Sequence, residues 1–341
     1  MKMTKLKKTI FIIAGLLIIA VAGIGYMMIF SSNTRFEEKS YVLFIHEQSD
    51  LETWMQSEDF TKIVSNVASF QFTAKIKKVK AIKPGRYRIK SGMNNSAMLN
   101  MLRSGNQEAL SIRTDDVEDI YSLAGKLGKK MKADSLDFIR VFTDEAKISA
   151  FGFNTFTLPC MLFPNTYEFF WTMSPDDFLV KMKKLHDEYW TQAKRDQAAS
   201  IGLTPIEIGI LASIVKAETA KKDEAPYIAG LYLNRLRIGM ALQSDPTAVF
   251  GRKVHAERVY LSDLRTESPY NTYLIKGLPP GPINFPETIY LDAVLNPVKH
   301  THIYMCAQPG GTGYHNFSRT LEQHNVYRNE YTSWLEKNGV R

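Results

Sequence analysis

The sequence has little cysteine, no internal repeat and no low-complexity segment. Its 341 residues include only Cys160 and Cys306, so the chain can form at most one internal disulfide. An oxidising compartment would permit that bond. We favour the alternative that both are small hydrophobic residues in separate parts of the core, because they lie far apart in sequence. Hydrophobic residues make up 45% and charged residues 23%, which is the balance of a globular protein.

A clustered positive charge is also missing. The formal net charge is +8, but four lysines in residues 1–8 account for half of it. The rest of the chain is only mildly basic and lacks the clustered basic face that nucleic-acid binding usually needs. We therefore expect no nucleic-acid partner.

The length suits one large core or two modest ones, which predicts a catalytic domain and a smaller module.

The N-terminal residues predict a membrane anchor. A basic tail, residues 1–8, precedes an uncharged run over residues 9–30, long enough to span a bilayer as a helix. Lysines before the run and none directly after it place the N-terminus in the cytoplasm and the remainder outside. A cleaved signal peptide is the alternative, because Ala20-Val21-Ala22 has the form of a cleavage site. The run continues to Phe30, which favours a retained, single-pass anchor in the cytoplasmic (inner) membrane.

The chain outside the membrane divides into two predicted parts of an α+β protein. Residues 41–111 read as a small βα module: "YVLFIH" and "GRYRIK" have strand character, and "SGMNNSAMLNMLRSGN" predicts a helix with Ser96 as N-cap and Gly105 as its stop. Residues 112–341 read as a mixed α+β domain. It has predicted helices near 116–131, 134–145, 175–198, 224–238 and 319–337, a helix that begins at Thr204 and carries Glu218, and a hairpin formed by "THIYMCA" and "YHNFS".

Several local signals mark where these elements begin and end. Ser174 and Pro175 suit the start of the 175–198 helix, and Asp223 suits the cap of the 224–238 helix. The segment "GMALQSDPTAVFG" that follows is expected to be irregular around Asp245-Pro246. Residues 268–286 are predicted to run in turns and extended backbone.

Glu218 is the unusual residue of the helix that begins at Thr204. The helix begins with a capping box, in which Thr204 is the N-cap and Glu207 lies three residues later. Apolar residues lie seven, four and three positions before Glu218 and share its stripe on the helix. They are Leu211, Ile214 and Val215.

Two interpretations of Glu218 are open from spacing alone. A carboxyl buried on an apolar face has its charged form disfavoured and its pKa raised, which suits a general acid for a glycosidic leaving group. Alternatively, Glu218 pairs with Lys222, four residues later, on a solvated helix face. Spacing alone favours the ion pair, because surface Glu/Lys pairs are common.

Four motifs change that balance: "ASIVKAETA", "YLNRLRIGMALQSDPTAVFG", "SPYNTYLIKGLPPGPI" and "HNFS". In order and spacing over residues 204–318 they resemble the endolytic murein transglycosylase family (MltG, YceG-like). The upstream half is similar in organisation, with one N-terminal anchor, a small LysM-like module over 41–111 and the segment "LFPNTYEF". The chain departs from the family pattern at "NFP" after "GPI" and at Cys160.

The resemblance implies lytic cleavage of peptidoglycan inside the glycan strand, between N-acetylmuramic acid (MurNAc) and N-acetylglucosamine (GlcNAc). The family's catalytic glutamate falls on Glu218, acting first as acid and then as base so that a 1,6-anhydro end forms without water. Seven residues in the matched motifs are candidate substrate-binding groups, each with a structural role as the alternative. They are Asn234, Gln243, Ser244, Asp245, Tyr270, Asn271 and His315.

No cofactor is implied. The expected partners are glycan strands and, through the family resemblance, peptidoglycan synthases, beside which this enzyme would set strand length. Two other functions stay open: a muramidase that uses water, with Asp245 as the best second carboxylate, and a non-catalytic scaffold that binds the cell wall. A metal site at His300, His302 and His315 is conceivable but disfavoured, because zinc sites have tighter ligand spacing and this reaction needs no metal.

Overall fold

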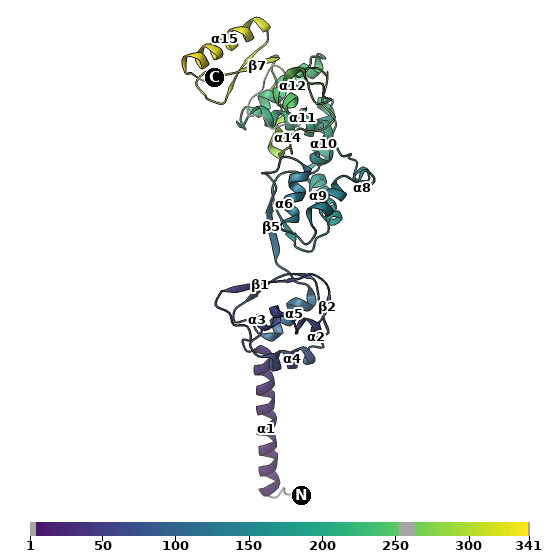
Figure 1. Ribbon diagram of the computed structural model, residues 1–341, viewed down its shortest axis with the longest axis vertical. Coiled ribbons are helices and arrows are strands. Elements are labelled where there is room, and N and C mark those ends of the chain that lie inside the picture. Colours follow the sequence, from purple (N-terminus) through teal and green to yellow (C-terminus); the bar gives the residue numbers. More distant parts are fainter. Residues whose placement is uncertain (1–4, 252–262, 340–341) are drawn as a thin grey trace. The chain divides into compact units, whose positions relative to one another are not determined.

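The computed structural model describes residues 5–251 and 263–339, which form two compact units (Figure 1). The first unit consists of Met1–Ile112 with two short later segments, Lys130–Lys132 and Glu168–Met173. The second unit holds the remainder of the chain. The 41–111 module and the 112–341 catalytic domain, as functional domains, stay predictions.

The N-terminal run forms one continuous helix, α1 (Lys5–Phe30). Within the described residues it is the one unbroken helix that is long and apolar enough to cross a membrane, and none of its residues is buried. Its last turn is fixed to the remainder of the first unit, because the carbonyl of Met28 accepts hydrogen bonds from Thr73 Oγ1 at 3.1 Å and Asn95 Nδ2 at 2.9 Å. A single N-terminal apolar helix of this kind is consistent with a membrane anchor.

The two predicted strands of the first unit are confirmed. β1 (Ser40–Ile45) and β4 (Gly85–Lys90) pair antiparallel with Leu43 opposite Tyr87, and both of these side chains are fully buried. A second, two-residue ladder joins β2 (Ser49–Asp50) to β3 (Ala81–Ile82). The helices of this unit are α2 (Leu51–Trp54), α3 (Glu58–Ile63), α4 (Val67–Ile76) and α5 (Asn95–Ser104).

The predicted cap of the last of these helices is wrong. Asn94, not Ser96, is the N-cap of α5, and its side chain accepts from the backbone N–H of Ala97 at 2.8 Å. Ser96 lies inside the first turn and is buried. Gly105 ends the helix at φ 75°, as the pattern predicted, because glycine adopts this left-handed conformation without strain.

Three predicted helices of the second unit differ from expectation, because local caps break or shorten them. The 116–131 helix is α6 (Ile120–Gly128), which begins only after the capping box of Asp119. The 134–145 helix is α7 (Ser135–Phe142), followed by a separate α8 (Glu145–Ser149). The 175–198 helix is two: α9 (Pro175–Tyr189) and α10 (Gln192–Ile201), the second capped by Thr191. Ser174 caps α9 as predicted.

Three shorter elements complete this part of the chain. A 3₁₀ turn, η1 (Leu158–Cys160), lies in the proline-containing segment. β5 (Ala109–Arg113) pairs with β6 (Thr166–Phe170) in a two-stranded sheet.

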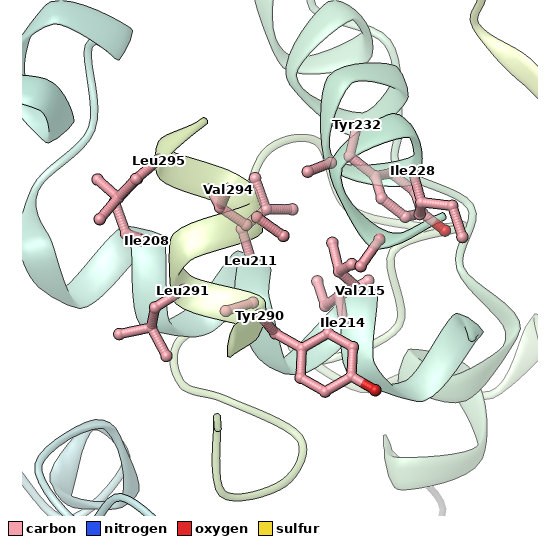
Figure 2. Packing of buried hydrophobic residues seen from close by; sticks show 14 of the residues in the cluster. Ile208, Leu211, Ile214, Val215, Ile228, Tyr232, Tyr290, Leu291, Val294 and Leu295 are labelled. Atoms are coloured by element: carbon pink, nitrogen blue, oxygen red, sulfur yellow. The ribbon is translucent and has the colours of Figure 1, made fainter. Parts of the chain in front are cut away.

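Three helices build the core around the candidate site: α11 (Pro205–Glu218), α12 (Ala225–Arg237) and α14 (Thr288–Leu295). Figure 2 shows Leu211, Ile214 and Val215 of α11 among side chains of α12 and α14. All three are fully buried, so the predicted apolar stripe of α11 is confirmed. The capping box of Thr204 and Glu207 is confirmed as well.

Two further predictions, the Asp223 cap and the irregular segment around Asp245-Pro246, are wrong. α12 has no side-chain cap, and the carboxylate of Asp223 instead accepts from Tyr314 Oη at 2.9 Å. The segment expected to be irregular around Asp245-Pro246 is a helix, α13 (Asp245–Gly251), because a proline is tolerated in a first helical turn. A 3₁₀ turn, η2 (Asp263–Arg265), follows, and residues 268–286 contain the predicted turns, with no helix or strand among them.

The C-terminal segment is the predicted hairpin and helix. β7 (Tyr304–Ala307) pairs with β8 (His315–Ser318), with His315 opposite Ala307, and α15 (Leu321–Lys337) packs against both strands. The two cysteines are free. Cys160 is buried against α11, where its Sγ lies 3.8 Å from the carbonyl of Ile206.

Candidate active site

Glu218 is the last residue of α11, and this position decides between the two interpretations of it. The next residue, Thr219, is extended, so Lys222 lies outside the helix and is exposed. Glu218 forms no ion pair with any described residue, so the alternative of a Glu218–Lys222 pair is wrong. A four-residue spacing brings side chains together only while the helix continues, and α11 ends at Glu218.

One oxygen of the Glu218 carboxyl is held by two hydroxyl groups. Tyr232 Oη on α12 donates to Oε1 at 2.6 Å, and Ser244 Oγ, just before α13, donates to the same atom at 2.5 Å. No group in the described part of the chain donates to Oε2. The carboxyl is therefore oriented through Oε1.

The surroundings of Glu218 favour its protonated form. Burial raises the pKa of the Glu218 carboxyl, and the negative charge of Asp245 raises it further. The hydrogen bonds from Ser244 and Tyr232 and the charge of His315 lower this pKa, but burial is the largest cause. Burial also raises the pKa of Tyr232 well above its ordinary value, so its phenol stays a hydrogen-bond donor.

The turn that presents Ser244 is fixed by two threonines. The backbone N–H of Ser244 donates to Thr272 Oγ1 at 3.0 Å, and Thr247 Oγ1 donates to the carbonyl of Ser244 at 2.6 Å. Thr247 and Thr272 also share a 2.7 Å hydrogen bond. The preceding residue, Gln243, is exposed and has φ 50°, an uncommon conformation for a residue with a side chain.

Asp245, the candidate second carboxylate, is exposed at the start of α13. Its Oδ1 accepts a 2.5 Å hydrogen bond from Tyr273 Oη. Asp245 and Tyr273 are both close enough to Glu218 for their charges to interact with it. The structure thus brings Ser244, Asp245 and Glu218 together, as the motifs suggested.

Two predicted substrate-binding residues are committed to structural contacts. The amide of Asn271 is fully buried, donates to the carbonyls of Leu264 and Thr266 and accepts from the N–H of Tyr273. Asn234 Nδ2 donates to the carbonyls of His300 and His302 at 2.8 and 3.1 Å. Their side chains pin the loop and the hairpin, which is the alternative role that the sequence left open.

Tyr270 and the histidines occupy distinct environments. Tyr270 is half-buried, with its ring 4.7 Å from that of Phe250. His315 Nδ1 lies 3.0 Å from Glu224 Oε2. His300 and His302 stack on Tyr227, and among residues 5–251 and 263–339 no group of three or more metal-ligating side chains could hold an ion.

Sequence reasoning missed Tyr232, Tyr273 and Glu224, which contact Glu218, Asp245 and His315. Tyr232 lies in the "YLNRL" motif and Tyr273 in "SPYNTY", so both were within the stretches that carry the family resemblance. One signal in the sequence could have pointed to Tyr232. Its neighbours Leu231 and Leu233 are apolar, which suggests burial, and a buried phenol needs a hydrogen-bond partner.

Known proteins are similar to this chain over most of its length. The model of the YceG-like family matches residues 43–330. A protein of Bacillus subtilis named endolytic murein transglycosylase is 29% identical over 290 residues, which cover 80% of this chain and 79% of that protein. A Streptococcus pneumoniae protein of the same name is 26% identical over 323 residues, covering 83% of this chain but only 57% of that protein.

A crystal structure of a YceG-like protein from Listeria monocytogenes has the same fold. Its TM-score is 0.56 at 24% identity, and the match covers 85% of this chain and 99% of that structure. The family model, which matches well over half of the chain and includes Glu218 and its two hydroxyl partners, decides the assignment. This chain belongs to the YceG-like family.

Proposed function

We propose that this protein is a membrane-anchored endolytic transglycosylase that cleaves the bond between MurNAc and GlcNAc inside peptidoglycan strands, with Glu218 as general acid and then base. Membership of the family and the names of its relatives make it an enzyme of the lytic transglycosylase class. The observation that carries the proposal for Glu218 is its carboxyl, held through Oε1 by Tyr232 and Ser244 and favoured in the protonated form by burial.

The reaction needs one carboxyl in two protonation states. Protonated Glu218 gives its proton to the glycosidic oxygen, which leaves with GlcNAc as the C1–O bond breaks. The resulting carboxylate then takes the proton of the MurNAc 6-hydroxyl, whose oxygen bonds to C1 and closes the 1,6-anhydro ring. Glu218 is protonated again, and no water is consumed.

The two hydroxyl donors suit this cycle. Hydrogen bonds from Tyr232 and Ser244 stabilise the carboxylate formed by the first proton transfer, while burial raises the pKa of the carboxyl before it. Gln243, exposed beside Ser244, and Asp245 are the groups we assign to sugar binding. Tyr270 and His315 are further proposed contacts, and no cofactor enters the reaction.

The wider role follows from the anchor. α1 would retain the protein in the cytoplasmic membrane, with its N-terminus in the cytoplasm and the catalytic domain outside. In this proposal the LysM-like module over 41–111 binds glycan. The enzyme then terminates nascent strands beside peptidoglycan synthases.

The test compares products formed by the full-length protein in detergent. Wild type and Glu218→Gln are incubated with uncrosslinked glycan strands, and the new ends are identified by mass spectrometry. We expect 1,6-anhydro ends from wild type and a cleavage rate about 10²- to 10⁴-fold lower from Glu218→Gln.

Other products would identify the alternatives. Reducing ends from wild type would mean hydrolysis by a muramidase, with Asp245 as the second carboxylate. Strand binding without cleavage by wild type would favour the non-catalytic scaffold. Equal cleavage by both proteins would remove Glu218 from the mechanism.

A further inference from the structure

α4 packs against the last two turns of α1, the helix proposed to anchor the protein in the membrane. Thr73 Oγ1 on α4 donates to the carbonyl of Met28 at 3.1 Å. One position earlier, the ring of Phe72 lies beside Gly25, with Cζ 3.9 Å from the point that a Cβ atom on this glycine would occupy. α4 therefore lies beside α1 at the level of residues 25–28, before α1 ends at Phe30.

The length of the apolar run determines how deep this contact lies. The hydrocarbon core of a bilayer takes about 20 helical residues, and counted from Thr9, the first residue after the lysines, such a run ends at Met28. The span does not start earlier, because Lys7 and Lys8 are charged. A later start would draw the contact deeper into the bilayer. At about 1.5 Å per residue, Gly25 lies about 4.5 Å before Met28, so α4 lies where the hydrocarbon core meets the lipid headgroups.

The exposed apolar stripe of α4 lies on the side that faces the bilayer. Phe72 and Ile76 are four positions apart and share this stripe; Phe72 is half-buried and Ile76 is 57% exposed. Because Phe72 contacts Gly25 whereas Thr73 contacts Met28, the stripe is on the side of α4 nearer the middle of the membrane. In Figure 1, α4 lies at the end of the unit from which α1 emerges, and β1 lies at the opposite end. The two side chains therefore point toward the acyl chains.

Exposed lysines lie at the C-terminal end of the same helix. Lys75, Lys78 and Lys80 are exposed, and none forms an ion pair with any described residue. Ammonium groups beside a membrane-spanning helix attract anionic lipid phosphates, and their long stems let them reach the headgroups. An apolar stripe next to such cations is the pattern of a helix that lies in the membrane interface.

We propose that α4 is a membrane-binding surface, with Phe72 and Ile76 against the acyl chains and with Lys75, Lys78 and Lys80 on the phosphates of anionic phospholipids. The inference goes beyond the cleavage reaction and rests on the proposed function only through the anchoring of α1. Together with the hydrogen bonds from α4 and α5 to α1, this second attachment holds the first unit in one orientation on the membrane surface.

The test measures the depth of α4 in the full-length protein in lipid nanodiscs. Cys306→Ala removes the more accessible native cysteine, and Cys160 is buried and is retained. Ile76→Cys is labelled with the fluorophore NBD, and quenching by lipids with nitroxides at different positions on the acyl chain gives its depth. We expect the label about 5–10 Å into the boundary between headgroups and acyl chains.

Phe44→Cys is the matched control, because Phe44 is 43% exposed on β1, at the opposite end of the unit. Its label should be quenched by iodide in solution and not by the nitroxide lipids. Both substitutions replace exposed side chains, so the variants should fold.

A charge variant tests the lysines. Nitroxide-labelled phosphatidylglycerol should quench the label at position 76 about two- to fivefold more strongly than the same fraction of labelled phosphatidylcholine, because lysines near the surface attract anionic lipids. The combined variant Lys75→Gln, Lys78→Gln and Lys80→Gln should remove this preference. A control variant removes the same charge from exposed positions after α6 and should keep the preference. It combines Lys129→Gln, Lys130→Gln and Lys132→Gln.

A label at position 76 that iodide quenches as fully as the label at position 44 would overturn the proposal. Equal quenching by the two labelled lipids, or a preference that the charge variant keeps, would overturn the role of the lysines. Loss of the protein from the nanodiscs would contradict the anchor as well. Absent cleavage by wild type would contradict the proposed reaction alone, so the failures are distinguishable.

Discussion

The hydroxyl of Ser244 donates a 2.5 Å hydrogen bond to Oε1 of Glu218, from 26 positions further along the chain. Tyr232, 14 positions away, donates to the same oxygen. Two elements that follow α11 therefore converge on its last side chain. The bonds oppose the effect of burial on the pKa of Glu218, which gives predictions with definite signs.

Removing either donor should shift the pH dependence of cleavage upward. Both hydrogen bonds stabilise the carboxylate, so Ser244→Ala and Tyr232→Phe each raise the pKa of Glu218 above its wild-type value. Activity that requires protonated Glu218 should then persist to higher pH. The maximal rate should fall about tenfold, because the carboxylate formed during the reaction loses a donor. Rates measured across pH check both effects.

Tyr290→Phe is the matched control for this pair. It removes a buried phenol that donates to the carbonyl of Thr219 at 3.2 Å and does not touch the carboxyl. Its pH profile should coincide with that of wild type. If the activity of Ser244→Ala instead falls at a lower pH than that of wild type on the alkaline side of the profile, the role assigned to the Ser244–Glu218 hydrogen bond is wrong.

Glu218→Gln should gain stability relative to wild type as the pH rises. The folded-state pKa of Glu218 is raised, so the stability contributed by its neutral form is present below the unfolded pKa and is lost as the pH rises through the folded pKa. Gln cannot ionise and avoids that loss. Melting temperatures of both proteins at acidic and mildly alkaline pH test this, and a difference that shrinks with rising pH would refute it.

Gln243→Gly should stabilise the protein modestly. Gln243 has φ 50°, which costs a residue with a side chain about 1–2 kcal/mol, and the greater freedom of glycine in the unfolded chain offsets part of the gain. We expect a net gain of about 0.5 kcal/mol in the free energy of unfolding. Gln243→Ala removes the amide as well but keeps the backbone strain. The melting temperature of Gln243→Gly should therefore exceed that of Gln243→Ala, while both variants should weaken glycan binding equally.

Asn95→Ala should loosen the attachment of α1. The Asn95 side chain is fully buried, accepts from Asn33 Nδ2 at 2.6 Å and donates to the carbonyl of Met28. Its loss leaves buried polar groups unpaired and should cost about 2–4 kcal/mol of unfolding free energy. Denaturant unfolding in detergent measures the loss. Asn100→Ala, on an exposed position of the same helix, should change it by less than about 0.5 kcal/mol.

Local sequence signals predicted much of the fold. The capping box of Thr204, the cap of Ser174, the β1 and β4 strands and the C-terminal hairpin are confirmed because each depends on residues within a few positions of one another. Failures arose where two local signals competed. The predicted 175–198 helix, for instance, breaks because Thr191 can cap a new helix inside it.

The candidate site was predicted less completely. The apolar stripe of α11 marked Glu218, and the matched motifs marked Ser244 and Asp245. Nothing local could show that Tyr232 and Ser244 share one carboxyl oxygen, or that Asn271 and Asn234 are engaged by backbone carbonyls. Those contacts join residues distant in sequence, and they depend on how α11, α12 and the loops pack.

By itself the sequence determined the apolar N-terminal helix, the register of the α11 stripe and the family of the chain, since hydropathy, helical periodicity and motif spacing are properties of neighbouring residues. Only the tertiary structure decided whether Glu218 pairs with Lys222. The helix ends at Glu218, which separates the two side chains, and packing of α12 and the Ser244 turn supplies hydroxyl donors in place of a cation. Burial and hydrogen bonding depend on what the folded chain brings together.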